Sequence, residues 1–200
     1  WAANRIRDRV PGYEPAPHFG SALHAGRHGT SGAVRGLAGL TSNAQLPAIV
    51  RASALDELLR YPGATTLRAL TSGLTDADPL VRRVAVSGFE GVPASEGDRL
   101  LGRLLDDPVR AVRIETAHVL LPIGEAALPE SRRDSYRAAV AELEASYRAN
   151  DDRVEGRVGM GDLLVALGRS DEAESAYRSA LALDASAVPA AVNLADFYRR

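Results

Sequence analysis

Apolar residues recur at helical spacing along most of the chain from Leu46 onward. In the segment 47–60 they stand at positions i, i+4, i+5, i+8 and i+9, as on the buried face of an amphipathic helix. These positions are Val50, Ala54, Leu55, Leu58 and Leu59. The pair Pro62-Gly63 ends this segment, and a second helical segment follows with Leu67, Leu70 and Leu74. Because every periodic segment has the helical spacing, we predict an all-α fold.

The pattern repeats with a 31-residue step, since Val50-Arg51 recurs as Val81-Arg82 and Val112-Arg113. Other positions that keep this register are Leu55/Val86, Leu58/Phe89/Leu120, Pro62/Pro93, Leu70/Leu101, Leu74/Leu105 and Asp76/Asp107. A shared register of apolar, charged and turn positions predicts stacked helix pairs. We expect Asp78-Pro79 to begin the second pair, with Asp as the N-cap and Pro in the first turn. Asp107-Pro108 should do the same for the third pair, although it arrives slightly early.

These motifs resemble HEAT-like repeats of the short bacterial kind, in which Asp-Pro is followed by Val-Arg and an apolar helix. The resemblance covers roughly residues 46–124 and implies stacked antiparallel helix pairs.

A different period begins after Pro129. The segment 132–148 predicts a long amphipathic helix, and Met160-Gly161 and Leu164 recur with a 34-residue step as Leu194-Ala195 and Tyr198. The apolar stripe of the long helix consists of Tyr136, Val140, Leu143 and Tyr147. Between the recurring positions, small or aromatic residues stand where a tetratricopeptide repeat places its turn glycine, its small contacts and its aromatic knob. They are Gly168, Ala173, Tyr177 and Ala180.

This second pattern resembles a tetratricopeptide repeat over residues 153–187. It departs from the family at Arg157, where a Trp is common, and at Ala185, where the terminal Pro usually follows Asp. We expect Gly161, Ala173 and Ala180 to let two helices approach closely around Tyr177.

Together the patterns predict an α-solenoid of stacked helix pairs in three parts. Residues 1–45 form a lead-in, irregular over 1–17 and with short helices near 18–27 and 33–40. Residues 46–128 form HEAT-like repeats, and residues 129–200 form tetratricopeptide-like repeats. A second repeat begins near Val188 and holds one helix, so we expect a truncated array whose C-terminal helix either self-associates or frays in the monomer.

Composition excludes several classes of function. The net charge of −2 gives no general attraction to nucleic acid or anionic membranes, and no apolar run is long enough to span a bilayer. The absence of cysteine excludes disulfides, thiolate metal sites and covalent haem attachment within this segment.

No motif indicates catalysis, a cofactor or a metal, so we expect no enzyme activity. His24 and His28 have the i, i+4 spacing of zinc ligands, but no carboxylate at a matching spacing accompanies them. His118 is interpreted as a packing or groove residue. Gly159-Met160-Gly161 lacks the third glycine and the preceding strand of a dinucleotide site. The acidic pairs Asp106-Asp107 and Asp151-Asp152 are interpreted as helix caps.

Arg51, Arg82 and Arg113 form a row if the helix pairs stack. Such a row could bind anions or nucleic acid. The favoured interpretation is structural: each guanidinium pairs with an aspartate such as Asp76, Asp78 or Asp107 and tethers the turns between pairs.

The main functional hypothesis is a protein–protein interaction scaffold that binds a partner segment, or another domain of its parent chain, in a groove of the repeats. An alternative comes from the two repeat types together with the flanking segments Trp1-Ala2-Ala3 and Asn193-Leu194-Ala195-Asp196-Phe197-Tyr198-Arg199. This combination resembles the C-terminal region of certain bacterial multihaem c-type cytochromes. It implies a docking role and a periplasmic location, with haem held outside this sequence; otherwise the compartment stays open. A second alternative is nucleic-acid binding by the arginine row.

Overall fold

A computed structural model describes residues 9–10 and 18–199 of the chain. Within these residues the regular elements are eleven α-helices and two short 3-10 helices, and none is a strand. The predicted all-α class is therefore confirmed. The irregular lead-in predicted for residues 1–17 lies outside the described residues, except for Arg9 and Val10, which lie in a turn.

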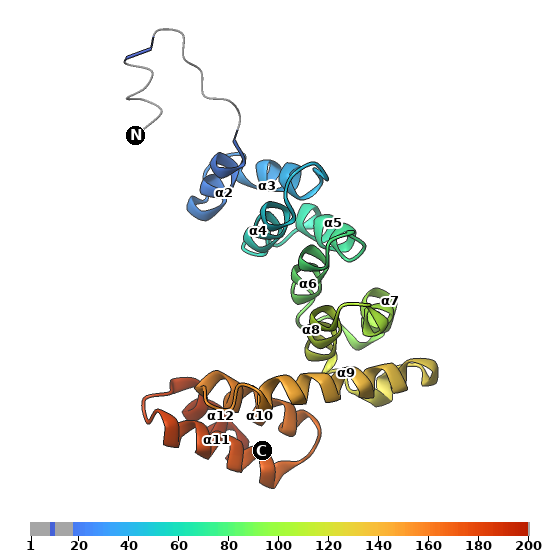
Figure 1. Cartoon of the computed structure of the whole chain (residues 1–200), viewed down its shortest axis with the longest axis vertical. Coiled ribbons are helices and arrows are strands. Elements are labelled where there is room, and N and C mark those ends of the chain that lie inside the picture. Colours follow the sequence, from blue (N-terminus) through green and yellow to red (C-terminus); the bar gives the residue numbers. More distant parts are fainter. Residues whose placement is uncertain (1–8, 11–17, 200) are drawn as a thin grey trace. The chain divides into compact units, whose positions relative to one another are not determined.

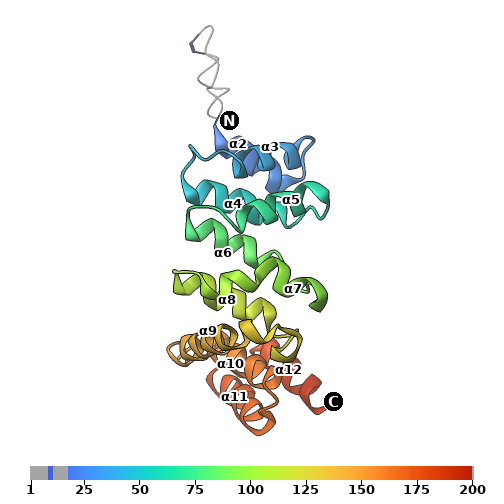
Figure 2. The same ribbon diagram turned by 90° about the vertical axis from the view of Figure 1, so that its right-hand side faces the viewer.

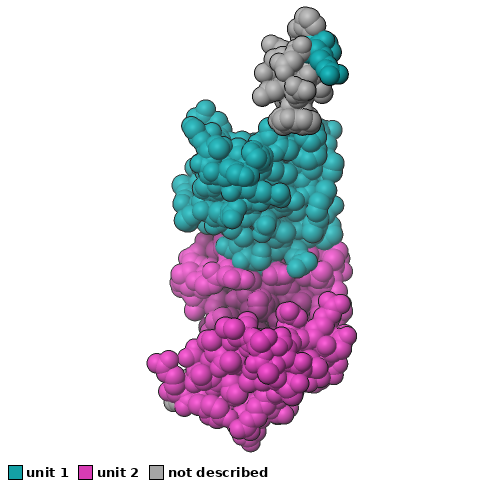
Figure 3. Space-filling view, turned by 90° about the vertical axis from the view of Figure 1, so that its left-hand side faces the viewer, with its two compact units in different colours: residues 1–88 teal, residues 89–200 magenta. Residues whose placement is uncertain are grey.

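Packing divides the chain into two compact units (Figure 3), called unit 1 (residues 1–88) and unit 2 (residues 89–200). The predicted ranges 1–45, 46–128 and 129–200 follow the repeat periods instead. Unit 1 therefore contains the predicted lead-in and part of the range 46–128, and unit 2 contains the rest of that range and the range 129–200.

Unit 1 consists of two helix pairs and a fifth helix (Figure 1). The elements are α2 (Phe19–His28), α3 (Ala33–Thr41), α4 (Ala48–Leu58), α5 (Ala64–Gly73) and α6 (Pro79–Ser87). Helix α3 packs against α2, α4 and α5, and α6 packs against α4 and α5 (Figure 2). The two short helices predicted in the lead-in are therefore a pair that belongs to the core of unit 1, where Leu37, Leu55 and Leu58 are fully buried.

Burial follows the 31-residue register. The valines of the register are buried at all three positions, and so are the residues equivalent to Leu58: Val50, Val81, Val112, Leu58, Phe89 and Leu120. The pairs Leu70/Leu101 and Leu74/Leu105 are buried as well. Two residues of the predicted apolar stripes are not: Leu59 is 37% exposed and Leu67 is 55% exposed.

Helix α6 begins as predicted, because Asp78 is its N-cap, accepting a hydrogen bond from the Leu80 amide at 2.9 Å, and Pro79 lies in its first turn. The matching prediction for Asp107-Pro108 is wrong. Helix α8 (Arg110–Leu120) has Val109 as its N-cap, and Pro108 precedes the helix.

The reason is that Asp107 takes the role of Asp76, its equivalent in the preceding repeat, and not that of Asp78. Asp76 Oδ1 accepts a hydrogen bond from the amide two residues on at 2.8 Å, and Asp107 Oδ1 accepts the corresponding bond from Val109 at 2.9 Å. Both side chains therefore stabilise the turn before a helix.

Unit 2 begins with α7 (Ala94–Leu101), which continues as the 3-10 helix η1 (Gly102–Asp106) and leads into α8. The other elements are η2 (Glu125–Ala127), α9 (Glu130–Arg148), α10 (Val154–Ala166), α11 (Ser170–Leu183) and α12 (Val188–Tyr198). Helix α9 packs against both α8 and α10, and α12 packs against both α10 and α11. Three of the four residues of the stripe predicted on α9 are buried, and the fourth, Tyr147, is half-buried.

The close approach of α10 and α11 occurs where the sequence predicts it. Gly168 has a φ of 71°, in the left-handed region, and turns the chain from α10 into α11. A Cβ on Gly161 would lie 2.4 Å from the ring of Tyr177, so only glycine lets this ring pack against α10. Ala173 and Ala180 are fully buried between the helices.

Helix α12 leaves most of its apolar side chains in solvent. Ala190 is its buried residue, whereas Val188, Val192 and Tyr198 are 68%, 50% and 57% exposed. The exposed C-terminal helix expected from the sequence is therefore present in the structure.

Candidate functional site

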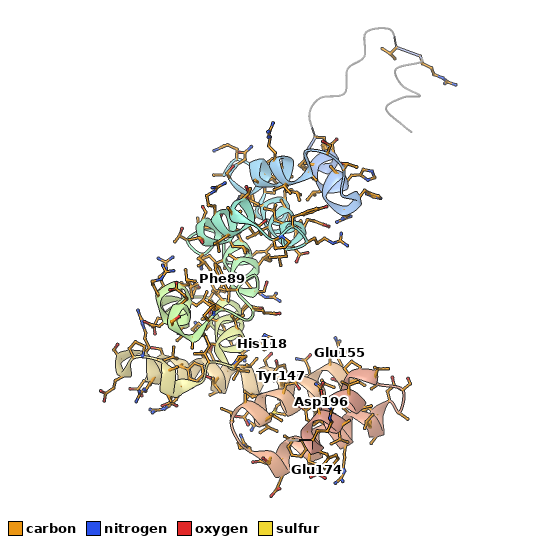
Figure 4. All side chains as sticks on the ribbon, turned by 180° about the vertical axis from the view of Figure 1, so that it is seen from behind. Phe89, His118, Tyr147, Glu155, Glu174 and Asp196 are labelled. Atoms are coloured by element: carbon orange, nitrogen blue, oxygen red, sulfur yellow. The ribbon has the colours of Figure 1, made fainter. Side chains whose placement is uncertain are left out.

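Unit 2 contains a pocket of about 540 Å³, a size within the range of ligand-binding sites. Its wall comes from the end of α8 and the turn after it, from α9 and α10, and from α11 and α12. The lining residues are His118, Leu121, Pro122, Gly124, Tyr147, Gly159, Asp162, Leu163, Val165, Ala166, Tyr177, Asn193, Asp196 and Phe197. We call this cavity the unit-2 pocket. Figure 4 labels His118, Tyr147 and Asp196 among these residues.

Glycines on α10 bring two tyrosines to the pocket. A Cβ on Gly159 would lie 2.4 Å from the ring of Tyr147, which projects from α9. Two residues on, Gly161 accommodates the ring of Tyr177 from α11 in the same way. The Gly159-Met160-Gly161 sequence therefore serves helix packing, in agreement with its rejection as a dinucleotide motif.

Asp162 is the most firmly positioned acidic group of the pocket. Its Oδ1 accepts a hydrogen bond from the Tyr177 hydroxyl at 2.6 Å and another from Asn193 Nδ2 at 2.8 Å. These donors come from α11 and α12, so one carboxylate on α10 joins three helices. Tyr177 is buried and Asp162 is exposed, so the carboxylate is held from the core side and open to solvent on the other.

The electrostatic environment of the pocket is negative. Burial raises the pKa of the Tyr147 hydroxyl, and the negative charges of Asp162 and Glu115 raise it further. Among the described residues that line the pocket, none is an arginine. Asp196 pairs with Arg199 at 3.4 Å, but the Arg199 side chain is 81% exposed.

The three arginines of the predicted row tether turns, which agrees with the structural interpretation. Arg51 donates to both carboxylate oxygens of Asp76 at 2.8 and 3.2 Å, and to the carbonyl of Leu46 at 2.5 Å. Arg82 donates to the carbonyls of Asp76 and Ala77 at 2.9 and 3.0 Å.

Arg113 repeats this pattern within unit 2. It donates to the carbonyl of Asp107 at 2.7 Å and to both carboxylate oxygens of Glu142 on α9. The Arg82 and Arg113 bonds to residues 76 and 107 are related by the 31-residue step. Asp107, the aspartate expected as the partner of Arg113, accepts its hydrogen bond through the backbone carbonyl, and Glu142 supplies the carboxylate of the ion pair.

The histidines take separate roles. His24 and His28 have ring centroids 4.0 Å apart, and His28 Nδ1 lies 2.9 Å from the His24 carbonyl. No group of three metal-binding side chains accompanies them in the part of the chain that the structure describes. His18 is the N-cap of α2, accepting a hydrogen bond from Gly20 at 3.0 Å. His118 lies at the unit-2 pocket, in agreement with its interpretation as a groove residue.

The interpretation of the acidic pairs as helix caps is wrong. Asp106 accepts hydrogen bonds from Arg132 at 3.0 Å and from Ser135 at 2.6 Å, and so links η1 to α9. Asp107 stabilises the turn before α8, whose N-cap is Val109. The N-cap of α10 is Arg153, one residue after the Asp151-Asp152 pair.

Sequence reasoning did not single out Asp162, and it used Asn193, Asp196 and Phe197 only as part of the segment that carries the cytochrome resemblance, with no role in a binding site. The signal that could have found them is the 34-residue step, which relates Asp162 to Asp196 and Gly159 to Asn193. Asp162 and Asp196 are both exposed, so packing of the core does not require their recurrence at the pocket.

Comparison of the chain with protein-family models and with curated proteins finds no match. Within the described residues, no helix combines the length and the apolar character that crossing a bilayer requires.

Proposed function

We propose that this chain is a helical-repeat protein that binds a segment of another protein in the unit-2 pocket. The observation that carries the proposal is the pocket itself, which is assembled from five helices and contains two carboxylates, an amide and two partly buried aromatic rings that are open to solvent. Such mixed linings are typical of sites that recognise side chains and backbone by direct contact. A partner from the same longer chain, as the cytochrome resemblance implies, would be received in the same way.

The repeat periods support the finer assignment to an α-solenoid with HEAT-like and then tetratricopeptide-like pairs. Arginines related by the 31-residue step donate to equivalent carbonyls, and aspartates related by the 34-residue step lie at one pocket. In repeat proteins the first helix of each pair commonly lines the binding surface. Here α10 and α12 have that position.

The nucleic-acid alternative has less support. Its three arginines are used for hydrogen bonds to turns and carboxylates, so their guanidinium donors are already engaged. A phosphate ligand would have to replace these bonds.

A pocket-filling variant tests the proposal. Ala166 lies at the pocket and is exposed, so Ala166→Trp should fill part of the cavity without disturbing the core. Ala141 is an exposed alanine of α9 outside the lining, and Ala141→Trp is the matched control. A displayed peptide library would be selected on the full-length chain.

Peptides that bind the pocket should keep their affinity for Ala141→Trp and lose about tenfold or more on Ala166→Trp. Selection of no peptide, or of peptides that bind all three proteins equally, would contradict the proposal.

A further inference from the structure

The two carboxylates of the unit-2 pocket hold equivalent positions in consecutive helix pairs. Asp162 on α10 and Asp196 on α12 are related by the 34-residue step, both are exposed, and both line the cavity. Since α10 and α12 pack against each other, the repeat places two like charges along one wall. Asp196 has only the exposed Arg199 as an ion-pair partner, so the two carboxylates repel each other, and a cation bound between them would relieve this repulsion.

Asp162 is oriented before any partner arrives. Both of its hydrogen bonds, from Tyr177 and Asn193, end on Oδ1. Among the described residues, no hydrogen bond or ion pair reaches Oδ2, so this oxygen keeps its lone pairs for an incoming donor. A carboxylate fixed by two neutral donors keeps its full negative charge and loses little side-chain entropy on binding.

Aromatic rings complete the complementarity to a flat cation. Tyr147 and Phe197 line the same cavity and are half-buried, so each presents part of its surface there. Guanidinium groups bind over aromatic faces and at the same time donate paired hydrogen bonds to a carboxylate. An ammonium group forms such paired hydrogen bonds less well, because it lacks the planar arrangement of N–H donors that a guanidinium has.

We propose that the partner segment places an arginine side chain in the unit-2 pocket, with its guanidinium donating to Asp162 and Asp196 and lying against the ring of Tyr147 or Phe197. This inference rests on the proposed function and names the chemistry of the partner. Burial is the main cause of the raised pKa of Tyr147, but the charges of Asp162 and Glu115 also raise this pKa, and the same charges favour a bound cation.

The test uses three end-capped, fluorescently labelled peptides of alternating alanine and one other residue. That residue is arginine, its neutral isostere citrulline, or glutamate. Binding to the full-length chain would be measured by fluorescence anisotropy at about 50 mM and about 300 mM salt. Asp162→Asn and Asp196→Asn remove the charges while leaving oxygen acceptors in place. Asp134→Asn, at a side chain of α9 that is 95% exposed and outside the pocket, is the matched control for net charge.

The arginine peptide should bind, and the citrulline and glutamate peptides should bind at least about tenfold more weakly at low salt. Each pocket variant should weaken arginine-peptide binding about fivefold, and Asp134→Asn should change it less than twofold, as expected for a distant exposed charge. Circular dichroism and thermal melting would confirm that each variant is folded, and Asp196→Asn keeps the test decisive if Asp162→Asn is not.

Equal binding of the arginine and citrulline peptides would overturn the inference, and so would loss of binding in Asp134→Asn to the same extent as in the pocket variants. Failure of this inference is distinguishable from failure of the proposed function. If the peptide library yields apolar or acidic sequences that Ala166→Trp excludes, the pocket binds a partner but not through arginine. If the library yields none, the pocket has no such role.

Discussion

Substitution of Arg51 by alanine should destabilise unit 1 more than any exposed arginine substitution in that unit. The Arg51 side chain is 9% exposed, and it joins two turns: the one before α4, through the Leu46 carbonyl, and the one before α6, through Asp76. Removing it deletes three hydrogen bonds and leaves Asp76, whose side chain is 18% exposed, without its guanidinium partner.

The expected loss follows from these contacts. Breaking a buried ion pair by removing one partner costs about 3–5 kcal/mol, because the remaining charge stays desolvated. Asp76 is partly reached by solvent and keeps its bond from the Asp78 amide, so we expect a smaller loss of about 2–3 kcal/mol in the free energy of unfolding.

The loss should depend on pH. Burial raises the pKa of Asp76, but the hydrogen bonds from Arg51 and the Asp78 amide, with the charges of Arg51 and Arg82, outweigh burial and hold the pKa below its usual 3.8. The stabilisation from this carboxylate is therefore complete above the usual pKa and is lost as the pH falls through the lower, folded-state value. The difference between Arg51→Ala and the unaltered chain should accordingly narrow as the medium is acidified below pH 3.8.

The assay is urea unfolding read by pulsed hydrogen exchange, so that peptides from unit 1 and unit 2 report separately. Arg27→Ala is the control: Arg27 pairs with Glu57 in the same unit, but its side chain is 61% exposed, and its loss should cost less than about 1 kcal/mol. Equal, small losses for the two variants at neutral pH would refute the assignment of Arg51 as a tether between turns.

Three further predictions concern other elements. Asp162→Asn should lower the pKa of Tyr147 toward, but not below, its usual 10.0, because the negative charge of Asp162 is removed and burial remains. Titration of the NMR signals of the ring carbons would measure this pKa. An unchanged pKa would contradict the negative potential of the pocket. In urea unfolding, Gly161→Ala should destabilise unit 2 by about 1–2 kcal/mol, because its Cβ would overlap the Tyr177 ring. Gly39→Ala in α3, where a Cβ meets no atom within 4 Å, should instead stabilise unit 1 by about 0.5–1 kcal/mol. A change of the same sign in both variants would be inconsistent with this packing. Helix α12 buries Ala190 alone among the described residues of the helix, so its amides should exchange with solvent faster than those of α10. Protection that rises with protein concentration would reveal self-association through the exposed face of α12. Full protection of α12 in a monomer would contradict both the fast exchange and the self-association.

The core could be predicted from the sequence to the extent that the repeat step specifies it. Val50, Val81 and Val112 share one register and are all buried, because each lies on the apolar face of its own helix. Leu67 has the correct helical spacing but is 55% exposed. Periodicity defines one face of a helix, whereas burial depends on how far a neighbouring helix covers that face, which spacing alone does not specify.

Turn chemistry was harder to predict. Asp107 precedes a proline just as Asp78 does, yet it takes the role of Asp76, because its position relative to the arginines matters more than its dipeptide context. The pocket was missed because its residues come from five helices and its acidic groups resemble ordinary solvated side chains. The 34-residue relation between Asp162 and Asp196 was the available signal.

The central claim is that a partner segment occupies the unit-2 pocket, and amide chemical-shift mapping of the full-length chain tests it most directly. A peptide selected on the chain would be titrated into isotope-labelled protein and, in parallel, into the Ala166→Trp variant. The account predicts that the perturbed amides cluster at Gly159, Asp162, Asn193 and Phe197, and that the variant shows no saturable change. Saturable perturbations confined to unit 1, or to residues of unit 2 outside the pocket, would contradict it.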